Sequence, residues 1–306
     1  MTCATTAPDA PVEGSTANRI VESTIQRSSQ IATLPVVALQ IIRLVENPDS
    51  TIEDLNRLIV NDPVLGVRIL KLVNSAYYGM SGRVKSIKHA ILLLGLNAIK
   101  NVAIAASLAK LIRGGHINDD FDAGDLWTHS VAVATAAKLL AQKTQFVLGD
   151  EAFLAGLIHD MGILIEMQTS GPNFGQMVQK LAVDETLTFR KAEEEFLGAS
   201  HEMIGAGLCR AWKFPPSLQF VTGYHHRPWE VAEAHRPLTT LVYIADVLAA
   251  RNGLGYTRTV ETDVIDPLLL GEVHLTEADL ELIVRELPDA MQESQDILSD
   301  GHEIDR

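Results

Sequence analysis

Seven histidine and aspartate residues that could ligate a metal or transfer a proton are spread through otherwise apolar, helical sequence. They are His129, His159, Asp160, His201, His225, His226 and Asp246. Neutral imidazole nitrogens and carboxylate oxygens form a mixed ligand set that suits Fe, Mn, Zn or Ni rather than Ca. Two such metals about 3.5–4 Å apart, bridged by a carboxylate, could activate water for in-line attack on phosphorus. No catalytic residue is assigned, and Asp160 is the candidate for that bridge.

Each of these residues also has an ordinary structural explanation. His129 lies on or beside an apolar stripe, where a lone histidine is usually a hydrogen-bonded core residue. Asp160 could cap the segment that follows it, and His201 could lie in the first turn of a helix whose N-cap is Ser200. These readings stay open beside the metal hypothesis.

The last residues of the set differ in how easily a structural role explains them. His225 and His226 end a helix, where histidine is favourable because of the helix dipole. Asp246 lies in the apolar segment TLVYIADVLAA. A carboxylate there must be paired, hydrogen-bonded, metal-bound or turned to a helix edge. Asp246 is therefore the residue that a purely structural role explains least well.

The composition predicts a closely packed helical protein. Among 306 residues, 47% are apolar, 5% are aromatic and the mean hydropathy is +0.12, so a large core can be buried. The net charge of −14 repels phosphate backbones, which argues against general nucleic-acid binding. A local basic patch could still bind a small anion.

The sequence favours a cytoplasmic location. Cys3 and Cys209 are far apart and give no disulfide framework, as expected in a reducing compartment. The N-terminus lacks the basic and apolar regions of a signal peptide. The longest apolar stretch, residues 90–112, is interrupted by Lys100, Asn101 and Lys110, so we interpret it as two buried helical segments rather than a membrane span.

Helical periodicity dominates from residue 20 onward, and no sustained period-two alternation occurs, so an all-α fold is predicted. Ser50 with Glu53 is the predicted capping box of the helix over 52–60. Asp62 and Ser86 are predicted N-caps of the next two helices. Further helices are expected at 125–142, 150–168, 173–183, 188–196, 200–212, 215–225 and 236–251.

Composition shifts divide the chain into three parts. Residues 1–18 look like a disordered tail. Residues 19–251 form the main domain, with an N-terminal helical subdomain at 19–115 and a second subdomain at 125–251, joined near the pair at 114–115 (GG). Residues 252–306 comprise a loop, an amphipathic helix that starts at Thr276 and ends at Pro288, and an acidic tail that could be a frayed helix.

Residues 31–228 resemble the HDOD domain, a helical output domain related to the HD and HD-GYP phosphohydrolases. The first half carries the most specific motifs, which are Leu34-Pro35, Asp62-Pro63-Val64-Leu65, LVNSAYYG at 72–79 and Ser86-Ile87 through Gly95. The second half is HD-like, with His129, HDMG at 159–162, His201, WKFP at 212–215 and His225-His226. The resemblance implies two packed helical subdomains, the second like an HD domain.

The sequence departs from the catalytic relatives in two places. HD-GYP enzymes have a lysine shortly after the His-Asp pair, and Ile163 takes that position here. The extended Gly-Tyr-Pro motif expected after the paired histidines is missing, and GYT at 255–257 is a superficial echo. HDOD proteins are generally regarded as signalling modules without established hydrolase activity. The resemblance therefore implies a candidate metal site rather than an assigned one.

Three functions are compatible with the sequence. The first is a bacterial regulatory module that acts through protein–protein interaction without catalysis. The second is a metal-dependent phosphohydrolase, such as a cyclic-nucleotide phosphodiesterase, in which Lys213, Arg227 and Arg236 could neutralise substrate phosphate. The alternative for each of these three cations is an ordinary solvated surface charge. The third is a nucleotide sensor that uses the same pocket for binding alone.

The expected partner is a signalling protein. Asn74, Ser75, Tyr78 and Gly79 lie in a predicted turn that either caps the preceding helix or forms a partner or ligand surface. The amphipathic helix near 276–287 could support an oligomer or pack on its own domain.

Overall fold

Short apolar segments that begin at capping residues fold as helices along nearly all of the described chain. The computed structural model of the protein describes residues 15–28, 35–47, 49–74, 83–112, 116–118, 120–144, 146–147 and 149–298. In chain order the α-helices are α1 (Thr16–Ser28), α2 (Val36–Glu46), α3 (Ile52–Val60), α4 (Pro63–Val73), α5 (Ile87–Leu94), α6 (Leu96–Ile112), α7 (Ala123–Lys143), α8 (Gly149–Ile158), α9 (Met161–Thr169), α10 (Gly171–Val183), α11 (Phe189–Phe196), α12 (His201–Ala211), α13 (Pro216–Tyr224), α14 (Arg236–Arg251), α15 (Pro267–Glu272) and α16 (Glu277–Leu298).

Two 3-10 turns and one small strand pair complete the described elements. The turns are η2 (Pro228–Glu230) and η3 (Glu233–His235). The strands β1 (His116–Asn118) and β2 (Phe121–Asp122) pair antiparallel. Apart from this pair, the described residues contain no β structure, so the predicted all-α class is confirmed.

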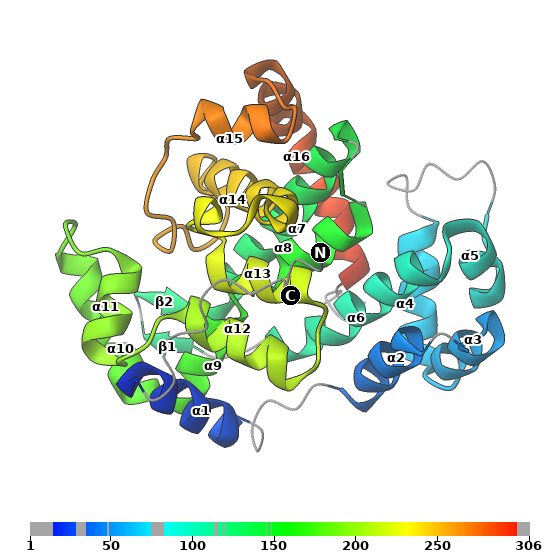
Figure 1. Cartoon of the computed structure of the whole chain (residues 1–306), viewed down its shortest axis with the longest axis horizontal. Coiled ribbons are helices and arrows are strands. Elements are labelled where there is room, and N and C mark those ends of the chain that lie inside the picture. The colour runs from blue at the N-terminus through cyan, green and yellow to red at the C-terminus, as the bar shows by residue number, and fades with distance from the viewer. Residues whose placement is uncertain are drawn as a thin grey trace, which may run out of the picture.

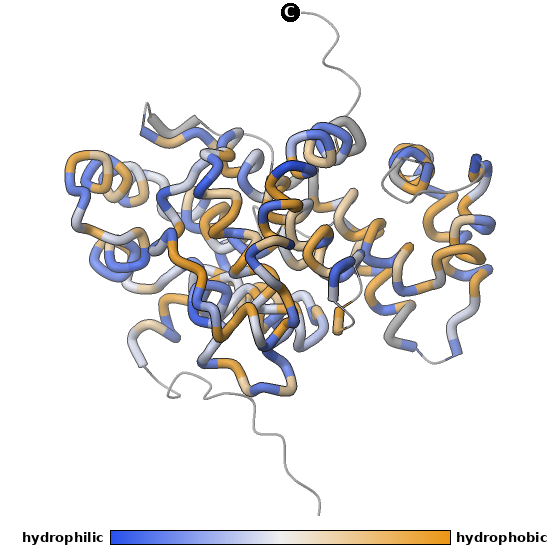
Figure 2. Tube along the Cα trace, turned by 90° about the horizontal axis from the view of Figure 1, so that it is seen from above, coloured by the Kyte–Doolittle hydropathy of each residue, from blue (hydrophilic) through white to orange (hydrophobic). Residues whose placement is uncertain are grey.

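The long helix α7 is the centre of the core. Every residue of α7 from His129 to Ala141 is buried, and the helix packs against α8, α14 and α16. α7 and α8 approach closely because Gly156 faces Ala134, where an added Cβ would lie 2.7 Å from the Ala134 Cα. Hydrophobic and hydrophilic residues alternate along the helices of the trace (Figure 2).

The helices α2 to α5 lie on one side of the molecule, and α6 leads from them into the rest of the chain (Figure 1). α6 packs against α2, α4 and α8, while α1 packs against α9 and α12 of the C-terminal part. The predicted division into two subdomains stays a prediction. Residues 1–14 of the predicted tail lie outside the described residues, and α1 already begins at Thr16.

The predicted helix starts are confirmed at two of three positions. Asp62 accepts a hydrogen bond from the Leu65 N–H, and Ser86 accepts one from the His89 N–H. The predicted capping box was one residue too early. It is formed by Thr51 and Asp54, because the Glu53 side chain instead pairs with Lys88.

The predicted end of the last helix at Pro288 was wrong. α16 continues through Pro288 to Leu298. Proline lacks the N–H of the helical ladder, but Met291, Ser294 and Leu298 beyond it are buried, and Ser294 lies 3.0 Å from the Thr135 hydroxyl of α7. Tertiary packing therefore outweighs the local cost of the proline.

None of the described helices is both long enough and apolar enough to cross a membrane. The apolar stretch at 90–112 forms α5 and α6 with a break at Gly95, whose φ is 87°. This confirms the interpretation of that stretch as two helical segments, but they are not buried throughout, because Leu92 and Leu93 of α5 are exposed.

Asn74 joins the end of α4 to the segment that precedes α5. Its amide donates to the carbonyl oxygens of Leu70 and Val84 at 2.7 and 2.8 Å, and its oxygen accepts from the Val84 N–H at 2.6 Å. The predicted turn residues Ser75, Tyr78 and Gly79 lie outside the described residues. Asn74 therefore does more than cap one helix.

We expect Asn74→Ala to lower the free energy of unfolding by about 2–3 kcal/mol, because three hydrogen bonds are lost at a half-buried site. Urea unfolding measures this loss. Asn74→Asp keeps the acceptor for the Val84 N–H but places a carboxylate oxygen, which cannot donate, against the Leu70 and Val84 carbonyls, so it should also destabilise the protein. If Asn74→Ala lowered the free energy of unfolding by less than about 0.5 kcal/mol, the hydrogen bonds of Asn74 would not stabilise this junction.

Lys138 is a buried cation of α7 that faces Asp150 at 3.3 Å. Burial lowers its pKa from 10.5 to about 8, although Asp150 partly offsets this. Between pH 8 and 10.5 the unfolded chain therefore binds more protons at this position than the folded chain. By linkage, the contribution of Lys138 to stability is constant below pH 8 and rises with pH across that window.

We expect the stability of the wild type relative to Lys138→Met to rise by roughly 2 kcal/mol between pH 7 and 9.5. Urea unfolding of both proteins at several pH values measures the difference. The exposed Lys191 provides the matched control, since Lys191→Met should show no such trend. A flat difference for Lys138→Met would mean that the buried amine keeps its ordinary pKa.

A candidate metal centre

The fold brings all seven predicted histidines and aspartates into one buried cluster. α7 contributes His129, the turn between α8 and α9 contributes His159 and Asp160, and α14 contributes Asp246. The start of α12 and the end of α13 contribute the rest, which are His201, His225 and His226. α7 packs on α8 and α14, and α13 packs on α8, α12 and α14, so these elements lie side by side (Figure 1).

A close contact between two helix starts places the His-Asp turn beside α12. The sequence predicted one helix over 150–168, but the chain turns at His159-Asp160 and α9 begins at Met161. At Gly162 an added Cβ would overlap the His201 carbonyl group and lie 2.6 Å from its carbon. Asp160 occupies the N-cap position of α9 without making a side-chain capping bond. Its carboxylate is thus available to the cluster instead.

Four of the imidazole rings use Nδ1 to bind groups outside the cluster. Three of them donate the Nδ1–H to a backbone carbonyl oxygen. His159 donates to Gly156 at 2.7 Å, His225 donates to Val221 at 3.1 Å, and His129 donates to Leu254 at 3.2 Å. Nδ1–H of His201 donates to the Glu193 carboxylate at 2.8 Å. Since a carbonyl oxygen can only accept, the bonds of His129, His159 and His225 fix the proton on Nδ1 and leave Nε2 facing inward.

The inward nitrogens converge on the two oxygens of Asp160. Oδ1 lies 3.3 Å from Nε2 of His225 and 3.5 Å from Nε2 of His201, and Oδ2 lies 3.2 Å from Nε2 of His159. Neither oxygen accepts a hydrogen bond from the described residues. The Nε2 atom of His159 also has no hydrogen-bond partner among them. Buried acceptors that face each other repel, so the arrangement requires a cation or extra protons between them.

Asp246 forms the second carboxylate of the cluster. Its Oδ1 lies 2.9 Å from Nε2 of His129, and its Oδ2 lies 3.6 Å from Nδ1 of His226. A carboxylate in an apolar helix needs a polar partner, and His129 is that partner for Asp246. Asp246 is therefore buried without being left unpaired.

The donor atoms form two groups that could hold a metal ion, and the two groups share one carboxylate. Asp160 belongs to two groups whose ligand atoms all lie within 4.8 Å of one another. The first group adds His201, His225 and His226, and the second adds His129 and His159. Unpartnered buried acceptors, outward Nδ1 bonds and a nitrogen–oxygen donor set are what divalent ions such as Fe, Mn, Zn or Ni require.

The electrostatics of the cluster show what competes with a metal. Burial lowers the pKa of His159, but Asp160 and Asp246 more than offset this and raise it to about 9. Burial opposes ionisation of Asp160, yet His159, His225 and His201 hold its pKa well below the usual range. Burial and the other histidines hold the pKa of His226 well below its usual value. Protons occupy the cluster when metal does not, so metal binding would release them.

Sequence reasoning missed two buried glutamates behind His201. Glu193 of α11 accepts the His201 Nδ1–H, and Glu166 of α9 is buried behind it. Burial raises the pKa of both carboxyl groups well above the usual range, and the charge of Glu193 raises that of Glu166 further. Glu166, inside the apolar run ILIEMQ, was visible as a signal, whereas Glu193 sits in a run of three glutamates typical of a surface.

Of the three predicted phosphate-binding cations, only Arg227 lies next to the cluster. It follows His226 and pairs with Glu202 at 3.3 Å and with Glu230 at 2.7 Å. Arg190, which the sequence did not single out, pairs with the same buried Glu202 at 3.1 Å. Both arginines beside the cluster therefore already form ion pairs with glutamates.

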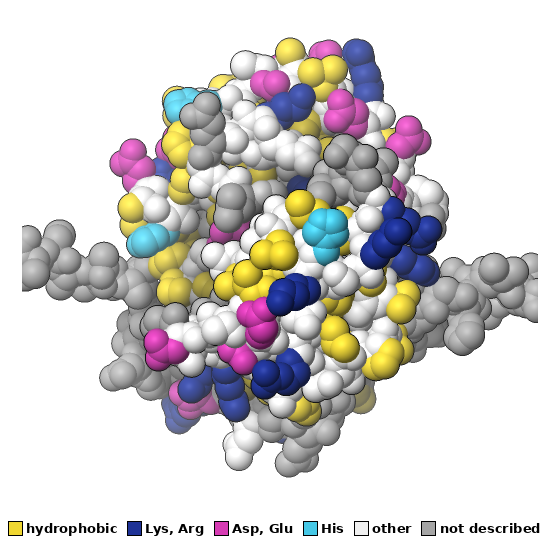
Figure 3. Space-filling model, turned by 90° about the vertical axis from the view of Figure 1, so that its right-hand side faces the viewer, with side chains coloured by type: hydrophobic (Ala, Val, Ile, Leu, Met, Phe, Trp, Pro, Cys, Tyr) yellow, Lys and Arg dark blue, Asp and Glu magenta, His cyan; other side chains and the backbone are white. Residues whose placement is uncertain are grey.

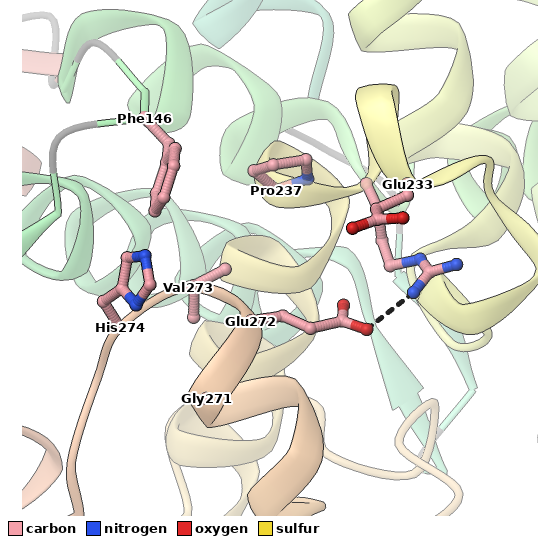
Figure 4. Close-up of a pocket in the computed structure, with 8 residues that line it drawn as sticks. Phe146, Glu233, Pro237, Gly271, Glu272, Val273 and His274 are labelled. Atoms are coloured by element: carbon pink, nitrogen blue, oxygen red, sulfur yellow. Dashed lines mark hydrogen bonds and ion pairs between the residues drawn. The ribbon is translucent and has the colours of Figure 1, made fainter.

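Arg236 and Lys213 lie elsewhere. Arg236 pairs with Glu272 at 2.7 Å and lines a pocket of about 330 Å³ beside Phe146 and His274 (Figure 4). Arg236 and Asp246 are separated by ten residues of α14, or about 15 Å along the helix. Lys213 stands in the turn after α12 with a φ of 60°. Neither makes a hydrogen bond or ion pair to the seven cluster residues in the part of the chain that the structure describes.

A C-terminal segment lies across His129 and helps to enclose the cluster. Leu254 accepts the His129 Nδ1–H, and the Tyr256 N–H donates to the Asp125 carbonyl at 3.0 Å. Gly255 has a φ of 72°, and an added Cβ would lie 2.9 Å from the His129 Cα. The GYT segment at 255–257 thus helps to enclose the cluster beside His129. The exposed fractions of the seven cluster residues range from 0% to 6%.

Comparison with known proteins is consistent with this geometry. The sequence model of the HDOD domain matches residues 31–228. An HDOD domain protein of unknown function from Geobacter sulfurreducens is 27% identical, with a TM-score of 0.70 over 92% of this chain and 97% of that one. A provisionally named signal transduction protein from Marinobacter aquaeolei VT8 (23% identical, TM-score 0.71, 92% and 65% covered) shares the fold. A provisionally named phosphohydrolase from Shewanella amazonensis SB2B also shares the fold. It is 24% identical, with a TM-score of 0.68 over 90% of this chain and 98% of that one.

Curated relatives are longer than the region they share with this chain. An uncharacterized protein of Treponema pallidum is 26% identical over 234 residues, which is 75% of this chain and 44% of that protein. The uncharacterized protein YuxH of Bacillus subtilis is 34% identical over 93 residues, covering 30% of this chain and 22% of YuxH. The chain therefore spans less than half the length of the curated relatives it matches.

Proposed function

Because the chain belongs to the HDOD domain family, we propose that it is a regulatory module of bacterial signal transduction that acts through protein–protein interaction without catalysis. The observation that carries this proposal is the enclosure of the His/Asp cluster. All seven side chains are at most 6% exposed. A hydrolase must bring a phosphate group and a water molecule to its metals, and this enclosure leaves little surface of the cluster for a phosphate to contact.

The residue after the His-Asp turn supports the same proposal. Ile163, at the position of the lysine in HD-GYP enzymes, is fully buried against apolar side chains such as Leu164 and Phe174. It cannot supply positive charge to a substrate. Arg227 and Arg190, the cations beside the cluster, are engaged with Glu202.

The cluster has a role in this proposal without turnover. Asp160, with His201, His225 and His226 on one side and His129 and His159 on the other, would hold divalent metal. A bound ion would supply positive charge to the unpartnered carboxylate oxygens. The ligands come from α7, α12, α13 and the turn between α8 and α9, so they would tie these elements together.

Turnover of phosphoesters tests the proposal. Protein reconstituted with Fe or Mn is incubated with cyclic dinucleotides and with bis(p-nitrophenyl) phosphate, and Asp160→Ala serves as the control. We expect wild type and variant to release product at the same background rate. Hydrolysis by the wild type that Asp160→Ala abolishes would contradict the proposal.

That outcome would establish the alternative, a metal-dependent phosphohydrolase. The observation that favours the alternative is the place of Asp160 between two ligand groups, which suits a metal-bridging carboxylate. A nucleotide that raises the melting temperature without being consumed would instead assign the cluster region to a sensor.

A further inference from the structure

Exposed aliphatic side chains gather on the side of the molecule formed by α3, α4 and α5. Their exposed fractions range from 48% to 62%, and they are Val60, Val64, Val67, Leu92 and Leu93. Figure 3 looks onto this side and shows hydrophobic side chains interspersed with lysine and arginine. These residues are not needed for the core of α4, since Leu65, Ile69 and Val73 on its other face are buried.

The exposed positions follow helical spacing. Val64, Val67 and Lys71 are at i, i+3 and i+7 on the outer face of α4. On α5, Leu92 lies four residues after Lys88 and is therefore on the same face. Each stripe thus combines aliphatic side chains with a cation.

This part of the chain is basic, although the protein is acidic. Residues 35–112 contain nine Lys and Arg but five Asp and Glu, in a chain whose net charge is −14. Lys71, Arg83 and Lys85 are exposed, and no described acidic side chain lies within ion-pair distance of them. The acidic residues nearby are used locally, because Asp54 and Asp62 cap helices and Glu53 pairs with Lys88.

One flank of the same region already binds an acidic amphipathic helix. α16 contains seven Asp and Glu and one Arg, and it packs against α4 and α7. Its apolar face is buried through Leu280, Ile283 and Leu287. The outer face of α4, in contrast, carries exposed aliphatic residues of the same kind without a cover in the described chain.

We propose that the α3–α5 face binds an acidic amphipathic helix of a partner protein. Its apolar residues would contact Val60, Val64 and Val67, and its carboxylates would face Lys71 and Lys85. Helix-in-groove recognition uses this pattern of apolar anchors flanked by complementary charge. The proposal rests on the proposed regulatory function and names the partner chemistry of the module.

A labelled synthetic peptide tests the surface with the full chain. The probe is an acidic amphipathic helix of about 18 residues, with leucine on one face and glutamate on the other. A peptide with every glutamate replaced by lysine and a scrambled acidic peptide serve as controls. We expect fluorescence anisotropy to show binding of the acidic helix, weakened by salt, and at least about tenfold weaker binding of both controls.

Surface variants locate the binding. Val64→Ser with Val67→Ser, and Lys71→Glu with Lys85→Glu, should each weaken binding at least about tenfold without changing the melting temperature, since all four side chains are exposed. Lys191→Glu on α11 is the matched control and should bind like the wild type. Equal binding of all three peptides, or no binding at 1 mM peptide (roughly −4 kcal/mol), overturns the proposal.

Two other outcomes separate this inference from its premise. Self-association of the chain in sedimentation that Val64→Ser with Val67→Ser abolishes would assign the face to a second copy and overturn the proposal. Hydrolysis that depends on Asp160 would overturn the regulatory function, whatever the peptide does. A missing peptide interaction in a protein without hydrolase activity overturns the surface alone.

Discussion

Gly162→Ala is expected to destabilise the protein by on the order of 4 kcal/mol and to disrupt the His/Asp cluster. An added Cβ would overlap the carbonyl group of His201, and both partners are backbone at the start of a helix. Neither α9 nor α12 can yield by rotating a side chain. Relief requires the two helix starts to separate, which moves Asp160 away from His201.

Urea unfolding and metal content of the variant measure both effects. Gly171→Ala is the matched control, because a Cβ at this helical glycine meets no atom within 4 Å. We expect the control to change stability by at most about 0.5 kcal/mol. A Gly162→Ala protein with wild-type stability and metal content would show that the approach of α9 to α12 does not position the cluster.

Removing metal from the wild type is expected to lower its melting temperature by on the order of 10 °C. A ligand present at a thousand times its dissociation constant stabilises a protein by about 4 kcal/mol, and 1 kcal/mol shifts the melting of a chain this size by about 2–4 °C. Without metal, both oxygens of Asp160 and the inward nitrogens of His159, His201 and His225 face each other unless protonated.

Differential scanning calorimetry before and after dialysis against a chelator measures this shift. Asp160→Ala is the control, because it removes the ligand that both groups share and should show no further shift. Restoration of the wild-type transition by Fe or Mn completes the test. An identical transition with and without chelator would mean that protons alone satisfy the cluster.

The sequence allowed the helical fold and the seven cluster residues to be predicted because both depend on local signals. Helical periodicity and capping residues such as Asp62 and Ser86 mark the elements. Asp246 stands out because a carboxylate in an apolar helix needs a partner. The structure places that partner, His129, on another helix 117 residues away.

Other features depend on tertiary contacts that local patterns do not encode. Glu193 looks like a surface residue until α11 packs beside His201. Pro288 looks like a helix end until the burial of Ser294 and Leu298 holds α16 together beyond it. Lys213 and Arg236 were predicted to neutralise phosphate in the hydrolase hypothesis, but Lys213 stands in the turn after α12 and Arg236 pairs with Glu272.

In the proposed function, enclosure of the cluster connects a bound metal to the regulatory role. The residues that would hold metal come from α7, α12, α13 and the turn between α8 and α9, so occupancy would stabilise the packing of these elements. The Nδ1 hydrogen bonds of His129 and His201 would extend this stabilisation to Leu254 and Glu193 at the edge of the cluster. A buried centre of this kind suits stabilisation of one conformation of the module better than repeated exchange of substrate and product.

The most direct test of the central claim is the metal content of the protein, measured by elemental mass spectrometry after purification without chelators or an affinity metal, with Asp160→Ala alongside. The enclosed His/Asp cluster predicts about two equivalents of Fe or Mn per chain, lost in Asp160→Ala. A metal-free wild-type protein would contradict the claim and make the cluster a proton-filled structural core.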